Sequence, residues 1–177
     1  MIAFVSGGAR SGKSGQAEAL ARRWHQARGG RLYYLATAKA SDGEMARRIA
    51  RHREARGVDW TTLEEPLDLM AALDRVVAGS TLLLDCLTLW ASQVLYASGL
   101  EERQGLAMME ALLERARVQD IALVVVSNDI NEDIPPRGAE VRRYLRFLQR
   151  LHRQVAHEAE MVIQVVAGMP IHWKRHE

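Results

Sequence analysis

The sequence Gly7-Gly8-Ala9-Arg10-Ser11-Gly12-Lys13-Ser14 lies between a short apolar run, residues 2–5, and a segment that favours helix, residues 16–23. Strand, glycine-rich loop and helix in this order are the context that the phosphate-binding motif G-x-x-x-x-G-K-[ST] requires. An ordinary glycine-rich turn is the alternative interpretation. Because motif and context agree, the stretch predicts a binding site for a nucleoside triphosphate.

The residue types in this loop explain how such a site works. Gly7 and Gly12 allow the backbone to curl so that its N–H groups face a phosphate, and the start of the following helix adds the positive end of its dipole. Lys13 supplies a mobile positive charge for the β- and γ-phosphates, and Ser14 offers a hydroxyl group to Mg²⁺.

Composition sets limits on the class of protein. The chain has 177 residues, of which 48% are hydrophobic and 26% charged, as expected for one globular domain covering residues 1–177. A net charge of +2 does not by itself argue for nucleic-acid binding. The single cysteine, Cys86, excludes an internal disulfide and fits a reducing cytoplasm. We expect no signal peptide and no membrane span, because the most apolar region, residues 82–100, contains Asp85 and several polar residues.

Strand-like and helix-like segments alternate along the chain. Strands are predicted at residues 2–6, 31–36, 81–85, 121–127 and 161–166, and residues 60–65 are irregular or a short strand. Helices are predicted at residues 13–27, 42–56, 66–77, 87–98, 101–118 and 139–158, with residues 168–177 as a tail. This alternation predicts an α/β fold: a mostly parallel sheet with helices on both faces.

A second nucleotide signal is the apolar run Leu82-Leu83-Leu84 that ends in Asp85. P-loop proteins use an acid in this position to hold Mg²⁺, although many strands end in aspartate simply as a turn residue. The presence of the P-loop favours the magnesium role for Asp85, with Ser14 as its companion ligand.

The segment of residues 42–56 is rich in arginine and contains one histidine, His52. On a helix, Arg48 and His52 share a face. A solvated basic helix is one interpretation. The other is functional, because the segment follows a strand whose carboxyl end should lie near the phosphate site, and imidazole is a competent nucleophile toward phosphorus.

Several short motifs occur together in one order and resemble the adenosylcobinamide kinase/adenosylcobinamide-phosphate guanylyltransferase family of cobalamin biosynthesis. The motifs are the P-loop GGARSGKS, Ala36-Thr37-Ala38, Asp42-x-Glu44-Met45-x-x-Arg48-Ile49, His52-Arg53-x-x-Arg56, Trp60-x-Thr62-x-Glu64 and Leu84-Asp85-Cys86-Leu87-Thr88. The P-loop is shared by many families, whereas its combination with the His-Arg segment is far more specific.

The resemblance implies a cytoplasmic bifunctional enzyme with a RecA-like P-loop fold that assembles as a homotrimer. Its first reaction would phosphorylate adenosylcobinamide with ATP or GTP, and its second would transfer GMP from GTP to the resulting phosphate through a guanylyl-histidine. His52 would be the nucleophile and Lys13 the other catalytic residue, with Mg²⁺ as cofactor. The implied nucleotide contacts are Gly7, Gly8, Ala9, Arg10, Ser11, Gly12, Lys13, Ser14, Ala36, Thr37, Ala38, Arg53, Glu54, Ala55, Arg56, Glu64 and Asp85.

The chain departs from the family pattern in two places. The family usually has Asn-Glu-Val-Gly where this chain has Asn128-Asp129-Ile130-Asn131, and the Gly-x-x-Asn-Gln element of the last helix is absent around residues 148–154. These differences leave open which residues hold the corrinoid and whether the kinase reaction is retained. A plain small-molecule kinase and a nucleotide-dependent switch protein remain the alternatives. His25, His152 and His157 are predicted to be surface or interface residues.

Overall fold

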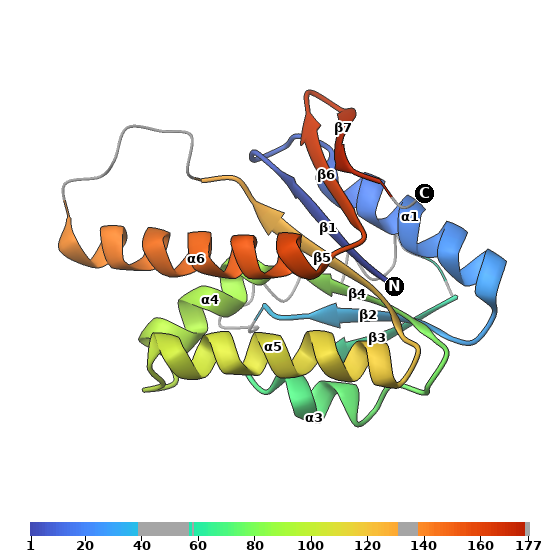
Figure 1. Ribbon diagram of the computed structural model, residues 1–177, viewed down its shortest axis with the longest axis horizontal. Helices are drawn as coiled ribbons and strands as arrows, with labels where there is room; N and C mark the ends of the chain where they lie inside the picture. The colour runs from blue at the N-terminus through green and yellow to red at the C-terminus, as the bar shows by residue number, and fades with distance from the viewer. Residues whose placement is uncertain (39–56, 58, 131–137, 176–177) are drawn as a thin grey trace.

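A central sheet flanked by helices forms the framework of the protein (Figure 1). The computed structural model describes residues 1–38, 57, 59–130 and 138–175. Seven strands follow the order β3-β2-β4-β5-β1-β6-β7. They are β1 (Ile2–Gly7), β2 (Leu32–Ala36), β3 (Trp60–Glu64), β4 (Thr81–Asp85), β5 (Ala122–Asn128), β6 (Met161–Val166) and β7 (Met169–Lys174). All neighbours pair in parallel except β6 and β7.

Helices cover both faces of this sheet, as the sequence predicts (Figure 1). One face packs against α1 (Lys13–Arg28), and the other against α3 (Leu69–Leu73), α4 (Leu87–Tyr96), α5 (Glu102–Val118) and α6 (Ala139–Glu158). The side chains of β1 alternate between the two cores, because Ala3 and Val5 join α1 whereas Ile2 and Phe4 join the opposite helices. Burial on both sides explains why the central strands are continuously apolar.

Two expectations about local structure are wrong. The helix predicted over residues 66–77 is limited to Leu69–Leu73, because the Asp68 carboxylate accepts hydrogen bonds from the N–H groups of Met70 and Ala71 and so begins the helix later. The predicted tail instead forms β7, which returns along β6 after a turn at Ala167 and Gly168, where both φ angles are positive (49° and 82°). The predicted helix of residues 42–56, which carries His52, lies outside the described residues.

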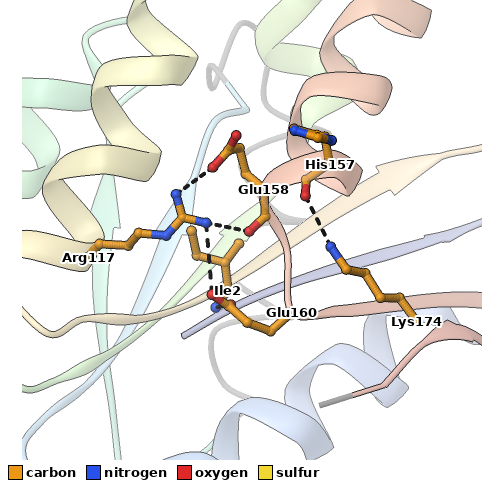
Figure 2. A network of polar contacts seen from close by, with 6 residues as sticks. All are labelled: Ile2, Arg117, His157, Glu158, Glu160 and Lys174. Carbon is orange, nitrogen blue, oxygen red and sulfur yellow. Dashed lines mark hydrogen bonds and ion pairs between the residues drawn. The ribbon is translucent and has the colours of Figure 1, made fainter. Parts of the chain in front are cut away.

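A polar network joins the chain segments at the amino end of β1 (Figure 2). The Ile2 N–H donates to Glu160 Oε2 at 2.5 Å, and Arg117 Nη1 donates to Glu158 Oε2 at the same distance. Lys174 Nζ donates to the His157 carbonyl at 3.1 Å. The hydrogen bond from Arg117 lowers the pKa of the Glu158 carboxyl group. These contacts tie together the ends of α5 and α6 and both strands of the β6–β7 hairpin.

The helices on the α6 side approach closely at Gly105 in α5. A Cβ atom at this position would lie 2.6 Å from Phe147 Cζ and 2.9 Å from Val94 Cγ1. Both distances are shorter than van der Waals contact, and Phe147 is fully buried. The glycine therefore allows α4, α5 and α6 to pack together.

We expect Gly105→Ala to lower the free energy of unfolding by about 1–3 kcal/mol, because the added methyl group overpacks this contact. Gly15→Ala is the matched control, since a Cβ atom on this α1 glycine meets nothing within 4 Å. The control should be neutral or more stable by up to about 1 kcal/mol, because alanine is the better helix former. Urea unfolding of both variants measures the difference, and equal stability would contradict the packing role.

A chain of buried polar side chains connects α6, β5 and α4. Ser127 Oγ lies 2.7 Å from His152 Nε2 and 3.0 Å from Thr88 Oγ1, which accepts the Asn128 N–H at 2.8 Å. Burial lowers the pKa of His152 to about 4, although the nearby Asp129 carboxylate opposes the shift. The prediction that His152 lies at the surface or an interface is thus replaced by a partly buried, neutral imidazole that is hydrogen-bonded within the protein.

This histidine should make stability depend on pH. The unfolded chain binds a proton at His152 below about pH 6.5, whereas the folded chain does so only near pH 4, so stability is complete above pH 6.5 and falls between these values. At 1.36 kcal/mol per pKa unit, the loss is at most about 3 kcal/mol. In His152→Gln, which retains a polar partner for Ser127, the unfolding free energy should vary less between pH 6.5 and 4 than in the parent. If the unfolding free energy of both proteins depended on pH in the same way, His152 would not be the cause.

Candidate nucleotide-binding and phosphoryl-transfer site

The P-loop lies between β1 and α1, in the strand–loop–helix arrangement that the sequence predicts. Gly12 caps the helix with a left-handed backbone (φ 89°), and Arg10 is also left-handed (φ 58°). The Ser11 N–H donates to the Gly8 carbonyl at 3.2 Å, which closes the turn. Helix α1 then begins at Lys13 with its positive dipole end toward the loop.

The loop is also held from the side by the β6–β7 hairpin. A Cβ atom on Gly7 would lie only 2.6 Å from the Val165 carbonyl oxygen and 2.5 Å from Ser11 Oγ, so no larger residue fits without a shift. The Gly168 N–H donates to the Ser11 carbonyl at 2.9 Å. The sequence explains Gly7 through backbone curvature, whereas the structure adds close packing against β6.

The polar side chains of the loop differ in burial and in hydrogen bonding. Lys13 is largely buried, and its ammonium group donates to the Gly8 carbonyl across the loop at 3.1 Å. Among the described residues, the buried Ser11 Oγ has no hydrogen-bond partner. Ser14 is half-buried in the first turn of α1, whereas Ala9 and Arg10 are exposed. The lysine and the start of α1 thus lie together at the loop, in the arrangement that binding of a phosphate requires.

Parallel register brings the other predicted residues to the same edge of the sheet. Ala36, at the end of β2, pairs with Glu64 on one side and Asp85 on the other. The Thr37 N–H donates to the Asp85 carbonyl at 3.0 Å, and Thr37 Oγ1 accepts the Cys86 N–H at 2.9 Å. Glu64 is exposed and Ala38 half-buried. The structure therefore groups Ala36 and Thr37 with Asp85 at one edge of the sheet.

Asp85 is positioned by a tyrosine. The Tyr34 hydroxyl donates to Asp85 Oδ2, and the Tyr34 ring packs edge-on against Trp60 with centroids 5.9 Å apart. Strand β5 separates β4, which carries Asp85, from β1, which leads into the P-loop. Asp85 and Ser14 thus lie at the same edge of the sheet.

These oxygen groups suit Mg²⁺, which prefers hard ligands and retains several waters while bridging to phosphates. Asp85 offers a carboxylate and Ser14 a hydroxyl group. The described residues contain no group of three or more His, Cys, Asp or Glu side chains arranged for a metal ion.

Sequence reasoning did not identify a pocket on the other face of the sheet, beside the P-loop strand. Asp129 follows β5, and its carboxylate accepts hydrogen bonds from Ser6 Oγ at 3.1 Å and Gln164 Nε2 at 3.2 Å. The pocket has a volume of about 330 Å³ and is also lined by Phe4, His152 and Trp173, among others. A usable signal was the occurrence of Ser6 and Gln164 as polar residues within two otherwise apolar strands.

The predicted nucleophile His52 and the contacts Arg53, Glu54, Ala55 and Arg56 lie outside the described residues. Within the part of the chain that is described, no helix is long and apolar enough to cross a membrane.

Comparison with solved structures identifies the fold. A KaiC-like protein from Pyrococcus horikoshii OT3 is similar with a TM-score of 0.53 at 14% identity, covering 92% of this chain and 69% of that chain. The flagellar accessory protein FlaH from Methanocaldococcus jannaschii is similar with a TM-score of 0.52 at 12% identity, covering 98% of this chain and 78% of that chain. At such low identity these similarities concern the fold alone, which is that of P-loop NTPases.

Comparison with known sequences identifies the family. The chain is 43% identical over 169 residues to the bifunctional adenosylcobalamin biosynthesis protein CobP of Pseudomonas aeruginosa, covering 95% of this chain and 94% of that protein. It is 32% identical over 184 residues to the bifunctional adenosylcobalamin biosynthesis protein CobU of Salmonella typhimurium, covering 97% of this chain and 98% of that protein. The family described as cobinamide kinase / cobinamide phosphate guanyltransferase matches residues 3–173. The chain is therefore an enzyme of the cobinamide kinase / cobinamide phosphate guanyltransferase family.

Proposed function

We propose that this enzyme phosphorylates adenosylcobinamide with a nucleoside triphosphate and then transfers GMP from GTP to the product, giving adenosylcobinamide-GDP. The observation that carries the proposal is the P-loop, with Lys13 inside it and Asp85 at the same edge of the sheet, in a chain matched over nearly its whole length by a family of this description. ATP and GTP are the proposed nucleotides.

The P-loop provides the binding energy for the phosphates. The N–H groups of Gly8, Ala9 and the following residues, together with the start of α1, would surround the phosphate oxygens. Lys13 would exchange its bond to the Gly8 carbonyl for the β- and γ-phosphates. Ser14 and Asp85 would hold Mg²⁺, which when bound offsets negative charge on the transferred group. In this position Lys13 stabilises the charge that develops as the γ-phosphoryl group leaves.

The second reaction is assigned to His52. An imidazole nitrogen would attack the α-phosphorus of GTP, forming a P–N bond while the bond to the α–β bridging oxygen breaks and pyrophosphate leaves. An oxygen of adenosylcobinamide phosphate then attacks the same phosphorus and releases the histidine. Arg53 and Arg56 would contact phosphate oxygens, for which planar guanidinium groups are well suited. Glu54 and Ala55 are proposed to complete this nucleotide contact.

The nucleotide base would be bound beside β2 and β3. Glu64 is exposed at the end of β3, and its carboxylate is able to accept hydrogen bonds from the guanine N1–H and exocyclic amine. Ala36, Thr37 and Ala38 would form the adjoining wall; Ala36 pairs with both Glu64 and Asp85, and the Thr37 N–H donates to the Asp85 carbonyl. We also propose that the enzyme acts in the cytoplasm as a homotrimer, as the resemblance to its family implies.

A labelling experiment tests the covalent step. We expect the parent protein, incubated with Mg²⁺ and GTP and then denatured in mild base, to retain label from the α-phosphate but not from the γ-phosphate. His52→Ala should retain neither, because the attacking nitrogen is removed. His157→Ala is the matched control and should label like the parent. The His157 side chain is exposed, and in the polar network at the amino end of β1 only its backbone carbonyl accepts a hydrogen bond, from Lys174.

An unlabelled parent would rule out the covalent intermediate. Phosphorylation of adenosylcobinamide without release of pyrophosphate would then identify a plain kinase. Slow hydrolysis of GTP without any transfer would identify a nucleotide-dependent switch protein.

A separate prediction concerns magnesium. Removing the hydroxyl group that orients Asp85, in Tyr34→Phe, should raise the Mg²⁺ concentration for half-maximal activity by about tenfold, as is typical for groups that position a metal ligand. Tyr33→Phe is the control, because Tyr33 lies in the opposite core and its hydroxyl contacts the Val77 N–H. An unchanged Mg²⁺ requirement in Tyr34→Phe would exclude Asp85 from the metal site.

A further inference from the structure

The pocket beside Asp129 lies on the face of the sheet opposite α1. Phe4 and Ser6 of β1 line it, and these side chains alternate with Ala3 and Val5, which pack against α1. The pocket therefore lies on the α6 side of the strand that leads into the nucleotide loop, and Asp129 lies at the carboxyl edge of the sheet, where that loop begins. The volume of about 330 Å³ accommodates a small group or the end of a larger molecule, not a whole corrinoid.

Asp129 is fixed in place from three sides. Its N–H donates to the carbonyl of Gly7, the first residue of the P-loop, at 2.9 Å. Its carboxylate accepts from Ser6 and Gln164, and both hydrogen bonds end on Oδ2. No described residue donates to Oδ1. The carboxylate is thus held next to the phosphate-binding loop with one oxygen available to a ligand.

The walls of the pocket include aromatic side chains, which favour binding of an organic group. Gln164 Oε1 accepts a hydrogen bond from Trp173 Nε1 at 3.1 Å, which orients the amide that holds Asp129. Phe4 packs against the His152 ring with centroids 5.1 Å apart, and His152 Nε2 is already bonded to Ser127. Aromatic side chains therefore line the same pocket as the carboxylate.

Two charged side chains line the pocket, the Asp129 carboxylate and the exposed Arg153, and Asp129 is the one held beside the P-loop. A carboxylate repels phosphate oxygens, so this residue is not suited to hold the triphosphate itself. It is suited to accept a hydrogen bond from a hydroxyl group, and a positioned carboxylate beside a phosphate site is the arrangement that kinases use to orient the attacking hydroxyl.

We propose that this pocket binds the hydroxyl-bearing arm of the phosphoryl acceptor and that Asp129 accepts the proton of that hydroxyl group. The proposal rests on the proposed function, because it assigns the acceptor site of its first reaction. The acceptor oxygen forms a bond to the γ-phosphorus while the bond between this phosphorus and the β–γ bridging oxygen breaks. The hydroxyl proton passes to the Asp129 carboxylate, and the nucleoside diphosphate leaves.

The test compares the two half-reactions in one protein. In Asp129→Asn we expect the kcat for phosphorylation of adenosylcobinamide to fall by about 100-fold or more, which is typical for loss of a general base. Retention of the α-phosphate label on the protein should stay within about twofold of the parent, because that step does not use the acceptor hydroxyl. This label also shows that the variant is folded and binds nucleotide.

Asp120→Asn is the matched control. It makes the same carboxylate-to-amide change at an exposed residue that contacts Arg28, and its positive φ of 53° is tolerated by asparagine. Both activities should equal those of the parent.

Trp173→Ala provides a second test that does not alter a charge. Trp173 is 70% exposed, so its loss should not prevent folding. We expect a several-fold higher KM for adenosylcobinamide with an unchanged KM for the nucleotide, because the wall of the pocket contacts only the acceptor.

The outcomes separate this inference from the function on which it rests. A parent that is inactive in both half-reactions overturns the proposed function and the acceptor site together. An active parent with an equally active Asp129→Asn variant overturns only the role of Asp129. An unchanged KM for adenosylcobinamide in Trp173→Ala, with the parent active, overturns the assignment of the pocket.

Discussion

Parallel hydrogen bonding among the central strands is the constraint on which the site depends. In a parallel sheet all carboxyl ends meet at one edge, and the register then decides which residues become neighbours. Ala36 lies between Glu64 and Asp85, and Gly7 lies between Asn128 and Val165. Residues more than a hundred positions apart in the chain therefore meet through backbone geometry, before any side chain contributes.

The P-loop depends on the packing of that edge as well as on its own sequence. Gly7 touches the Val165 carbonyl so closely that a methyl group would not fit, and the turn after β6 donates a hydrogen bond to Ser11. The hairpin of β6 and β7 thus supports the loop from outside. Functional geometry at one end of β1 relies on the last two strands of the fold.

The two faces of β1 have different surroundings. Toward α1 the strand contributes only Ala3 and Val5 to an apolar core, and the loop beyond it carries the proposed phosphate-binding groups. Toward α6 it contributes Ser6, which bonds Asp129, in a pocket with aromatic walls. One strand can thus place the proposed phosphate site and a pocket that contains a carboxylate next to each other, because successive side chains of a strand point to opposite faces.

The amino-acid sequence alone determined the strand–loop–helix unit at residues 2–28, the alternation of strands and helices, and the order of motifs that resembles one family, because these features are local and periodic. It did not predict β7, since that strand exists only through pairing with β6, nor the buried neutral state of His152, since desolvation depends on surrounding layers. The sequence also did not predict the pocket at Asp129, because Ser6, Asp129 and Gln164 come from three separate segments of the chain. Only the tertiary structure decided these features, because strand pairing, burial and convergence of distant side chains are not encoded in any short stretch of chain.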